Sequence, residues 1–175
     1  MSTVMSTIHP RRPRATPLIE VRPSPIHGWG GFARRDLPER TRLIEYTGQR
    51  ITSDEADRRY PEEGGTRSHT VLFSLSNGRY IDAGVRGNLA RFINHSCTPN
   101  CRAVEEGKRI FIDTIVAVPA GTELTYDYKL TLPDDWQDPT TRQRYICDCG
   151  SPGCRRTLVD VPPRKRARVS RPRRS

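Results

Sequence analysis

Near the end of the chain, three cysteines lie within eight residues, at Cys147, Cys149 and Cys154, with glycine and proline between them. Thiolates are favoured zinc ligands, and a closed structural zinc site needs four ligands in a tetrahedron. The segment supplies three, so the fourth has to come from elsewhere in the fold. This requirement constrains the fold more than any other feature, because it joins the end of the chain to a distant segment. The alternative is three free thiols on a chain end.

The fourth ligand has few possible sources. Only Cys97, Cys101 and the four histidines could supply it, and the stretch 91–101 contains three of these residues, His95 being the third. Pro99 excludes a helix there, and the stretch lacks the alternation of apolar and polar residues expected of a half-buried strand. We predict an irregular, site-bearing loop onto which the cysteine-rich segment folds through a metal. A buried turn with incidental thiols is the alternative.

The formal net charge of +10 is carried by the two ends of the chain. Residues 1–18 contain three arginines and no acidic residue, and residues 161–175 contain seven lysines and arginines and no acidic residue. The 20 basic residues in 19–160 are balanced by 20 acidic ones. We predict two disordered basic arms, which suit nucleic acid, an anionic membrane or an acidic protein. The C-terminal arm fits a nuclear localisation signal, a tether or a solvated run.

Several classes of protein are excluded. The chain has no run of eighteen apolar residues, so we expect no membrane-spanning helix, and residues 1–10 lack the apolar core of a secretory signal. Five cysteines without such a signal favour a reducing compartment and metal binding over disulfides. We expect an intracellular protein outside the membrane, in the nucleus or on the chromosome of a eukaryote or host, or in the cytoplasm or nucleoid of a bacterium.

Short strands and dense turns dominate the expected secondary structure. The capping pattern at Thr52 and Glu55 predicts a helix to about Arg59, and one helical turn is expected over 86–90. Residues 131–144 are polar and predicted to form a linker loop. The expected strands cover 19–22, 41–46, 70–75, 80–82, 101–104, 109–115 and 123–128, with a glycine-rich turn at 27–31 running into another. This pattern predicts one mostly-β domain of about 130 residues.

Two further features could form a site. Gly28, Trp29 and Gly30 form a turn without the dinucleotide fingerprint, and the glycines would let a ligand approach the backbone; a plain tight turn is the alternative. Tyr126 and Tyr128 are two residues apart on a predicted strand, so they should share a face, whereas Asp127 should face away. With Tyr46 they could line a channel for an alkylammonium or amine, or pack as ordinary aromatic residues.

Together these pieces resemble the SET-domain protein-lysine methyltransferases with a post-SET zinc segment, and the trithorax-type group most. The resemblance covers about residues 19–159, and six motifs occur in the family's order. They are Gly28-Trp29-Gly30, Glu45-Tyr46-Thr47-Gly48, Tyr80-Ile81-Asp82-Ala83, Arg91 to Asn100, Glu123 to Tyr128, and the three cysteines from Cys147 to Cys154.

The resemblance implies a fold of several small β-sheets with few short helices and a pseudoknot, in which the chain near Tyr128 threads the segment bearing Asn94 and His95. It implies a SET domain over 19–130, a linker over 131–144 and a zinc-bound post-SET segment over 145–160. Val71 departs from the family, in which many members have tyrosine at this position.

The resemblance also implies roles for individual residues. Tyr128 matches the catalytic tyrosine, Tyr46 a channel residue, and Tyr126 the position that limits how many methyl groups are added. Cys97 matches the fourth zinc ligand beside the three C-terminal cysteines, so Cys101 is not one of the four implied ligands. The residues implied to bind S-adenosylmethionine are Gly28, Trp29, Gly30, Arg91, Asn94, His95 and Leu158.

The implied activity is S-adenosylmethionine-dependent methylation of lysine side chains on a histone or histone-like basic protein. Tyrosine at position 126 favours mono- or dimethylation, because its hydroxyl can hold a water where a further methyl group would lie. The alternative is a zinc-stabilised nucleic-acid-binding protein that uses the basic arms. We find no separate reader domain in the sequence.

Overall fold

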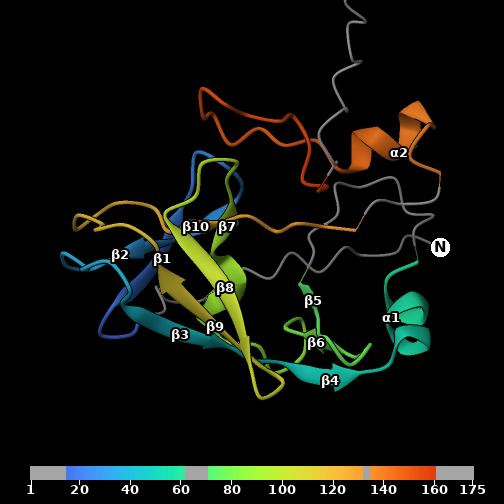
Figure 1. The fold of residues 1–175 in the computed structure, drawn as a ribbon, viewed down its shortest axis with the longest axis horizontal. Helices are drawn as coiled ribbons and strands as arrows, with labels where there is room; N and C mark the ends of the chain where they lie inside the picture. Colours follow the sequence, from blue (N-terminus) through green and yellow to red (C-terminus); the bar gives the residue numbers. More distant parts are fainter. Residues whose placement is uncertain (1–14, 62–70, 132–134, 161–175) are drawn as a thin grey trace, which may run out of the picture.

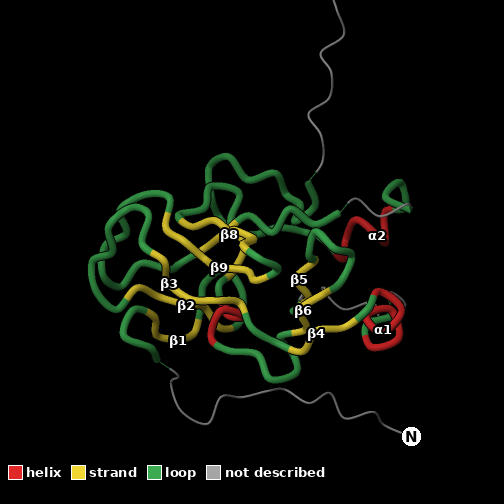
Figure 2. The backbone as a smooth tube through the Cα atoms, turned by 60° about the horizontal axis from the view of Figure 1, so that its bottom comes forward, coloured by secondary structure: helices red, strands yellow, loops and turns green. Residues whose placement is uncertain are grey.

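The computed structural model describes residues 15–61, 71–131 and 135–160. These residues form three small β-sheets that pack around one core, with the short helices α1 and α2 to one side (Figures 1 and 2). The mostly-β fold class is confirmed. The elements are β1 (Ile19–Pro23), β2 (Trp29–Ala33), β3 (Arg42–Tyr46), β4 (Gln49–Ile51), α1 (Ser53–Arg59), β5 (Leu72–Ser74), β6 (Tyr80–Asp82), the 3-10 helix η2 (Leu89–Phe92), β7 (Asn94–His95), β8 (Cys101–Glu106), β9 (Arg109–Thr114), β10 (Thr125–Tyr126) and α2 (Pro139–Arg144).

The first sheet is an antiparallel pair that presents the glycine-rich turn. β1 pairs with β2 from Ile19 opposite Ala33 to Pro23 opposite Trp29. The turn between them is closed by a hydrogen bond from the Ser24 N–H to the Gly28 carbonyl, at 2.9 Å. Gly28 has a φ of +45°, a left-handed conformation that favours glycine.

The five-stranded sheet has the order β3-β9-β8-β10-β7. The strands expected over 101–104 and 109–115 are confirmed as β8 and β9, and they pair as a hairpin with Cys101 opposite Thr114 and Glu106 opposite Arg109. β10 runs parallel to both β7 and β8. The parallel pairs therefore join residues that are 31 positions apart (Thr125 and Asn94) and 25 positions apart (Tyr126 and Cys101) in the sequence.

Two expectations about this sheet were wrong. The stretch 91–101 was predicted to be an irregular loop up to the strand at 101–104, yet Asn94 and His95 form β7 and pair with Thr125 and Tyr126. Both residues of β7 are buried, so polar and apolar positions do not alternate. The strand expected over 123–128 is also shorter, because only two of its residues pair. Tyr128 lies beyond its end, just before a left-handed turn at Lys129 with φ +47°.

The third sheet, β4-β6-β5, lies beside α1. The predicted helix start is confirmed, since the Thr52 side chain accepts the Glu55 N–H at 3.3 Å. The Glu55 carboxylate pairs with Arg58 and Arg59 rather than completing the capping box. β4 begins at Gln49, where no strand was expected. The predicted loop at 61–66 and the start of the strand at residue 70 lie outside the described residues, apart from residue 61.

The predicted linker over 131–144 is partly helical. α2 begins after Asp138, whose side chain accepts the Thr140 N–H at 2.8 Å, and Pro139 occupies the first turn. Proline is compatible with a first helical turn because its missing N–H has no partner there. Because residues 131–144 are mostly polar, their composition did not indicate this helix, in which only Thr141 is buried.

The predicted arms lie largely outside the described residues. Residues 15–18 are described, and Ala15 forms an isolated bridge with Glu20. The helical turn expected over 86–90 begins at Leu89 and is a 3-10 helix. None of the helices in the described residues is long and apolar enough to cross a membrane.

Candidate functional site

Asn94 fastens the glycine-rich turn to the central sheet. Its side chain is buried, and its amide nitrogen donates to Glu123 Oε1 at 2.8 Å. The same nitrogen lies 3.2 Å from Ser24 Oγ and 3.2–3.3 Å from the carbonyl oxygens of Trp29 and His27. The Ser24 hydroxyl also donates to Glu123 Oε1, at 2.7 Å. Asn94 and Glu123 thus hold the turn that contains the predicted cofactor-binding residues Gly28, Trp29 and Gly30.

The two glycines of this turn differ in their surroundings. A Cβ atom on Gly28 would meet no atom within 4 Å, so this part of the turn is open to a ligand. A Cβ atom on Gly30 would collide with the Glu123 carboxylate and lie 2.9 Å from the Ser24 Cβ. Gly30 therefore allows Glu123 to approach the turn and reach Asn94.

Replacing Gly30 with alanine is expected to lower the free energy of unfolding by about 1–3 kcal/mol, the usual cost of adding a methylene group to a packed interior. Gly153→Ala is the matched control, because its added Cβ meets only the Thr98 side chain, at 3.9 Å. Urea unfolding of both variants measures the difference. Equal stability of the two variants would contradict the steric role of Gly30.

His95 connects the backbone at Tyr128 to a cysteine. Its Nδ1 atom accepts the Tyr128 N–H at 3.1 Å, and its Nε2 atom lies 3.4 Å from Cys97 Sγ. Burial lowers the pKa of His95 to about 4, despite the nearby Asp127 carboxylate. The neutral ring then carries its proton on Nε2, because Nδ1 already accepts a hydrogen bond. The side chain therefore holds the segment after β10 against the cysteine.

Four aromatic rings cluster beside β7. The ring centroids of Tyr126 and Tyr128 are 4.9 Å apart, those of Tyr46 and Phe73 are 5.4 Å apart, and those of Phe73 and Tyr126 are 6.3 Å apart. The Tyr128 hydroxyl donates to the Ile93 carbonyl at 3.1 Å, and the Tyr46 hydroxyl donates to the Val71 carbonyl at 2.9 Å. The structure thus brings the three predicted tyrosines together.

Sequence reasoning missed Phe73 as a member of this cluster. Val71, the noted departure from the family, lies two residues earlier on the same extended segment. Residues two apart in a strand share a face, so this spacing was a usable signal. Burial raises the pKa of Tyr46, Tyr126 and Tyr128 above the usual value, so all three hydroxyls keep their protons.

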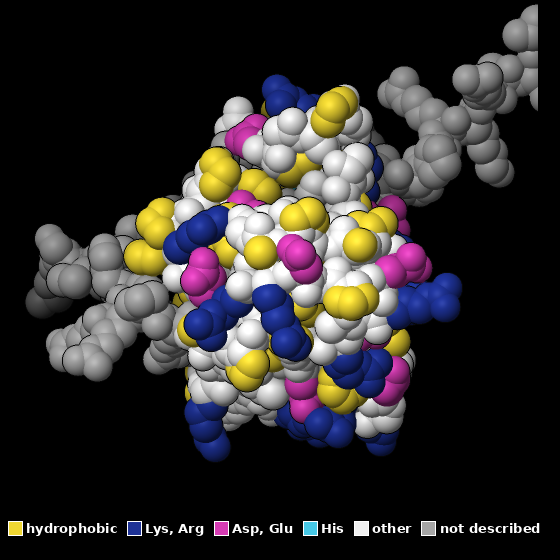
Figure 3. Space-filling model, turned by 90° about the vertical axis from the view of Figure 1, so that its left-hand side faces the viewer, with side chains coloured by type: hydrophobic (Ala, Val, Ile, Leu, Met, Phe, Trp, Pro, Cys, Tyr) yellow, Lys and Arg dark blue, Asp and Glu magenta, His cyan; other side chains and the backbone are white. Residues whose placement is uncertain are grey.

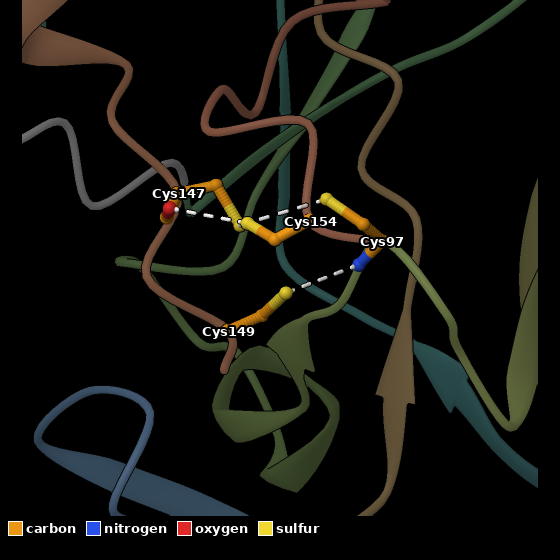
Figure 4. Close-up of side chains that lie close together, drawn as sticks. All are labelled: Cys97, Cys147, Cys149 and Cys154. Atoms are coloured by element: carbon orange, nitrogen blue, oxygen red, sulfur yellow. Dashed lines mark hydrogen bonds between the residues drawn. The ribbon is translucent and has the colours of Figure 1, made fainter. Parts of the chain in front are cut away.

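The four cysteines Cys97, Cys147, Cys149 and Cys154 gather at one point, with all four sulfur atoms within 4.8 Å of one another (Figure 4). The Sγ of Cys147 lies 3.7 Å from the Sγ atoms of Cys97 and Cys154. Zinc–sulfur bonds of about 2.3 Å at tetrahedral angles place sulfurs about 3.8 Å apart. The cluster therefore fits a four-thiolate zinc site.

Cys101 lies apart from this cluster. It is 1% exposed, and its thiol donates to Asn100 Oδ1 at 3.4 Å. Burial raises the pKa of Cys101 to about 12. Among the described residues, the metal-type cluster takes its fourth cysteine from position 97 and not from position 101.

The remaining predicted site residues lie at the margins of these groups. The Arg91 guanidinium donates to the Ala83 carbonyl at 3.2 Å. The Leu158 N–H donates to the Tyr145 carbonyl at 2.8 Å, and its carbonyl accepts the Leu130 N–H at 3.3 Å. Leu158 is therefore next to the segment that follows Tyr128.

The SET-domain family model matches residues 28–129, which is more than half of the chain. The chain belongs to the SET-domain family. The matched range of the SET domain contains the glycine-rich turn, the four aromatic residues and Cys97, whereas the three C-terminal cysteines follow it.

Curated proteins similar to this SET-domain chain are histone-lysine N-methyltransferases. One from Mycosarcoma maydis, described as H3 lysine-4 specific, is 41% identical over 142 residues, which is 77% of this chain and 9% of that protein. Set-2 of Caenorhabditis elegans is 40% identical over 79% of this chain and 9% of its own length. Human SETD1A is 40% identical over 77% of this chain and 8% of its own length. The chain thus spans about a tenth of the length of these relatives.

Proposed function

We propose that this SET-domain chain transfers methyl groups from S-adenosylmethionine to a lysine of a histone, and that lysine 4 of histone H3 is the target. The observation that supports this most is the cluster of Tyr46, Phe73, Tyr126 and Tyr128 directly beside Asn94 and His95. Aromatic faces and neutral hydroxyls suit an alkylamine side chain. The choice of lysine 4 is supported by the relative from Mycosarcoma maydis, which is described as H3 lysine-4 specific.

In this proposal the chain mainly orients the reacting groups. S-adenosylmethionine supplies an activated methyl group on a cationic sulfur, and it would bind between the open turn at Gly28 and the β7 residues. Tyr128 and Tyr46 hold the lysine amine in line with that methyl group. Oriented proximity of this kind can contribute roughly 7–11 kcal/mol to lowering the barrier.

The amine has to be neutral to react. A free lysine has a pKa of about 10.4, and burial among aromatic rings beside a positive charge lowers it. The proton leaves to solvent water before transfer, and the tyrosines cannot take it because their hydroxyls are already protonated. The four-cysteine cluster would hold zinc in a structural role, with no open position for substrate.

The test is methyl transfer by the full chain to intact histone H3 peptides, with S-adenosylmethionine labelled in the methyl group. A matched peptide with arginine in place of lysine 4 keeps the charge but removes the amine. Label on the first peptide alone supports the proposal. Label on both peptides would indicate that another lysine is the target, and label on neither would contradict the activity on H3.

Replacing Tyr126 with phenylalanine is expected to shift the product towards higher methylation. The hydroxyl lies in the cluster with Phe73 and Tyr128, where a water bound to it would occupy the space of an added methyl group. Mass spectrometry of the methylated peptide at equal turnover measures the ratio of mono-, di- and trimethyl-lysine, and we expect a several-fold rise in the higher forms. An unchanged ratio would count against the role of Tyr126.

Nucleic-acid binding through the basic arms is the second candidate. The run from Arg164 to Arg168 favours it, but this run lies outside the described residues. On the face shown in Figure 3, basic, acidic and hydrophobic side chains are interspersed, so this face has no continuous basic surface. Binding to duplex DNA with a steep salt dependence, together with no label transfer, would favour this candidate over the enzyme.

A further inference from the structure

Asp127 lies between Tyr126 and Tyr128 in the sequence, and its carboxylate accepts two hydrogen bonds from the Arg155 guanidinium. Arg155 Nη1 donates to Oδ2 at 2.7 Å, and Nη2 donates to Oδ1 at 2.9 Å. The Asp127 side chain is 18% exposed and that of Arg155 is 31% exposed. Two parallel hydrogen bonds between a guanidinium and a carboxylate fix both the distance and the orientation of the groups.

Arg155 also contacts the cysteine cluster. It follows Cys154 in the chain, and its backbone N–H lies 3.3 Å from Cys97 Sγ. One residue thus contacts the four-cysteine cluster with its backbone and the tyrosine segment with its side chain. The backbone N–H of the neighbouring Arg156 also contacts the cluster, 3.3 Å from Cys154 Sγ. Its side chain does not reach the tyrosine segment, because it is 78% exposed and lies 3.9 Å from Asp148.

The carboxylate of Asp127 also organises the chain after Tyr128. Its Oδ1 atom accepts the Lys129 N–H at 3.2 Å, where the backbone makes its left-handed turn. Beyond this turn, Leu130 and Val159 form a parallel bridge, and the Asp160 N–H donates to the Leu130 carbonyl at 2.9 Å. Release of Asp127 would therefore loosen the turn that fixes Tyr128 and the backbone pairing of the C-terminal segment.

From these contacts we infer that Arg155 and Asp127 form a latch that acts without a metal. The latch holds the cysteine-rich segment 145–160 against residues 126–130 and so positions Tyr128 and the cofactor site. Both residues are positioning residues, because their hydrogen bonds go to one another, to the Lys129 N–H and to Cys97 Sγ rather than to the aromatic cluster. The inference rests on the proposed function, since it assigns the latch to the site that would bind S-adenosylmethionine.

The test compares Arg155→Ala with Arg156→Ala in the full, zinc-loaded chain. S-adenosylhomocysteine, which is what remains of S-adenosylmethionine after methyl transfer, is the binding probe. We expect Arg155→Ala to weaken its binding by about tenfold, as measured by calorimetry. The variant should also speed amide exchange over 145–160. Zinc content should stay at the wild-type value. Arg156→Ala should match wild type in all three measurements.

Two further variants separate geometry from charge. Arg155→Lys keeps the charge but cannot form the paired hydrogen bonds, so it should lose most of the affinity that the alanine variant loses. The exchanged pair Asp127→Arg with Arg155→Asp should bind more tightly than either single variant. Both outcomes support a directional ion pair over a general effect of charge.

Other outcomes would overturn the latch. If the two alanine variants bind S-adenosylhomocysteine equally, Arg155 has no special role. If Arg155→Ala loses zinc in proportion to affinity, the residue supports only the metal site. Failure of the wild type to methylate histone H3 would contradict the proposed substrate but not the latch, because affinity and amide exchange are measured without a protein substrate.

Discussion

Replacing Tyr128 with phenylalanine should lower kcat for methyl transfer by on the order of 100- to 1,000-fold, the usual cost of removing one positioned hydrogen-bonding group at a reacting centre. The change removes a single oxygen atom and keeps the ring that contacts Tyr126 and His95. The amine would then lose a group that orients its lone pair towards the methyl group. Single-turnover methylation of a histone H3 peptide measures the effect.

The fold of this variant should survive. The lost hydrogen bond to the Ile93 carbonyl should cost about 1 kcal/mol of stability, which thermal unfolding can measure. Tyr80→Phe is the control, because Tyr80 lies on β6 and is not part of the ring contacts around Tyr128. Normal turnover by the Tyr128 variant would contradict the catalytic role assigned to Tyr128. Loss of turnover in both variants would point to a general effect of tyrosine removal.

Replacing Cys97 with serine should weaken zinc binding by more than 100-fold. A direct ligand is lost, and loss of an outer partner alone already costs about 10- to 100-fold. The segment 145–160 should then detach from the site, because structural zinc contributes its binding energy to folding. Affinity for S-adenosylhomocysteine should fall with zinc content, which elemental analysis measures after dialysis against a chelator.

Cys101→Ser provides the matched control. Cys101 is only 1% exposed, and its thiol lies beside Asn100 and outside the cluster. This variant should therefore keep one zinc ion per chain. Equal zinc content in the two serine variants would show that Cys97 is not a ligand. Loss of zinc only from the Cys101 variant would reverse the assignment of the two cysteines.

The sequence determined those features that depend on neighbouring residues. The cap at Thr52, the hairpin of β8 and β9 and the short strand β1 each follow from local composition and spacing. The count of three thiols from Cys147 to Cys154 required a distant fourth ligand before any fold was known. The mostly-β class followed from the number of short strands and turns.

Tertiary structure decided how these pieces meet. β7 and β10 have two residues each, too short for any periodicity to mark them, and their parallel pairing depends on a partner 31 residues away. Only this pairing places His95 against both Tyr128 and Cys97. Local chemistry could not separate Cys97 from Cys101, since both are cysteines and lie four residues apart. The family resemblance implied Cys97, and the fold brings Cys97 and not Cys101 to the cluster.

The same limit applies to Glu123, Phe73 and Arg155. In the sequence, Glu123 resembles any other strand residue. Its carboxylate can approach the glycine-rich turn only because Gly30 has no side chain. Arg155 is one of two adjacent arginines, and only the approach of Asp127 distinguishes it from Arg156. A sequence specifies which chemical groups are present and their local conformation, whereas contacts between distant segments depend on how the whole chain packs.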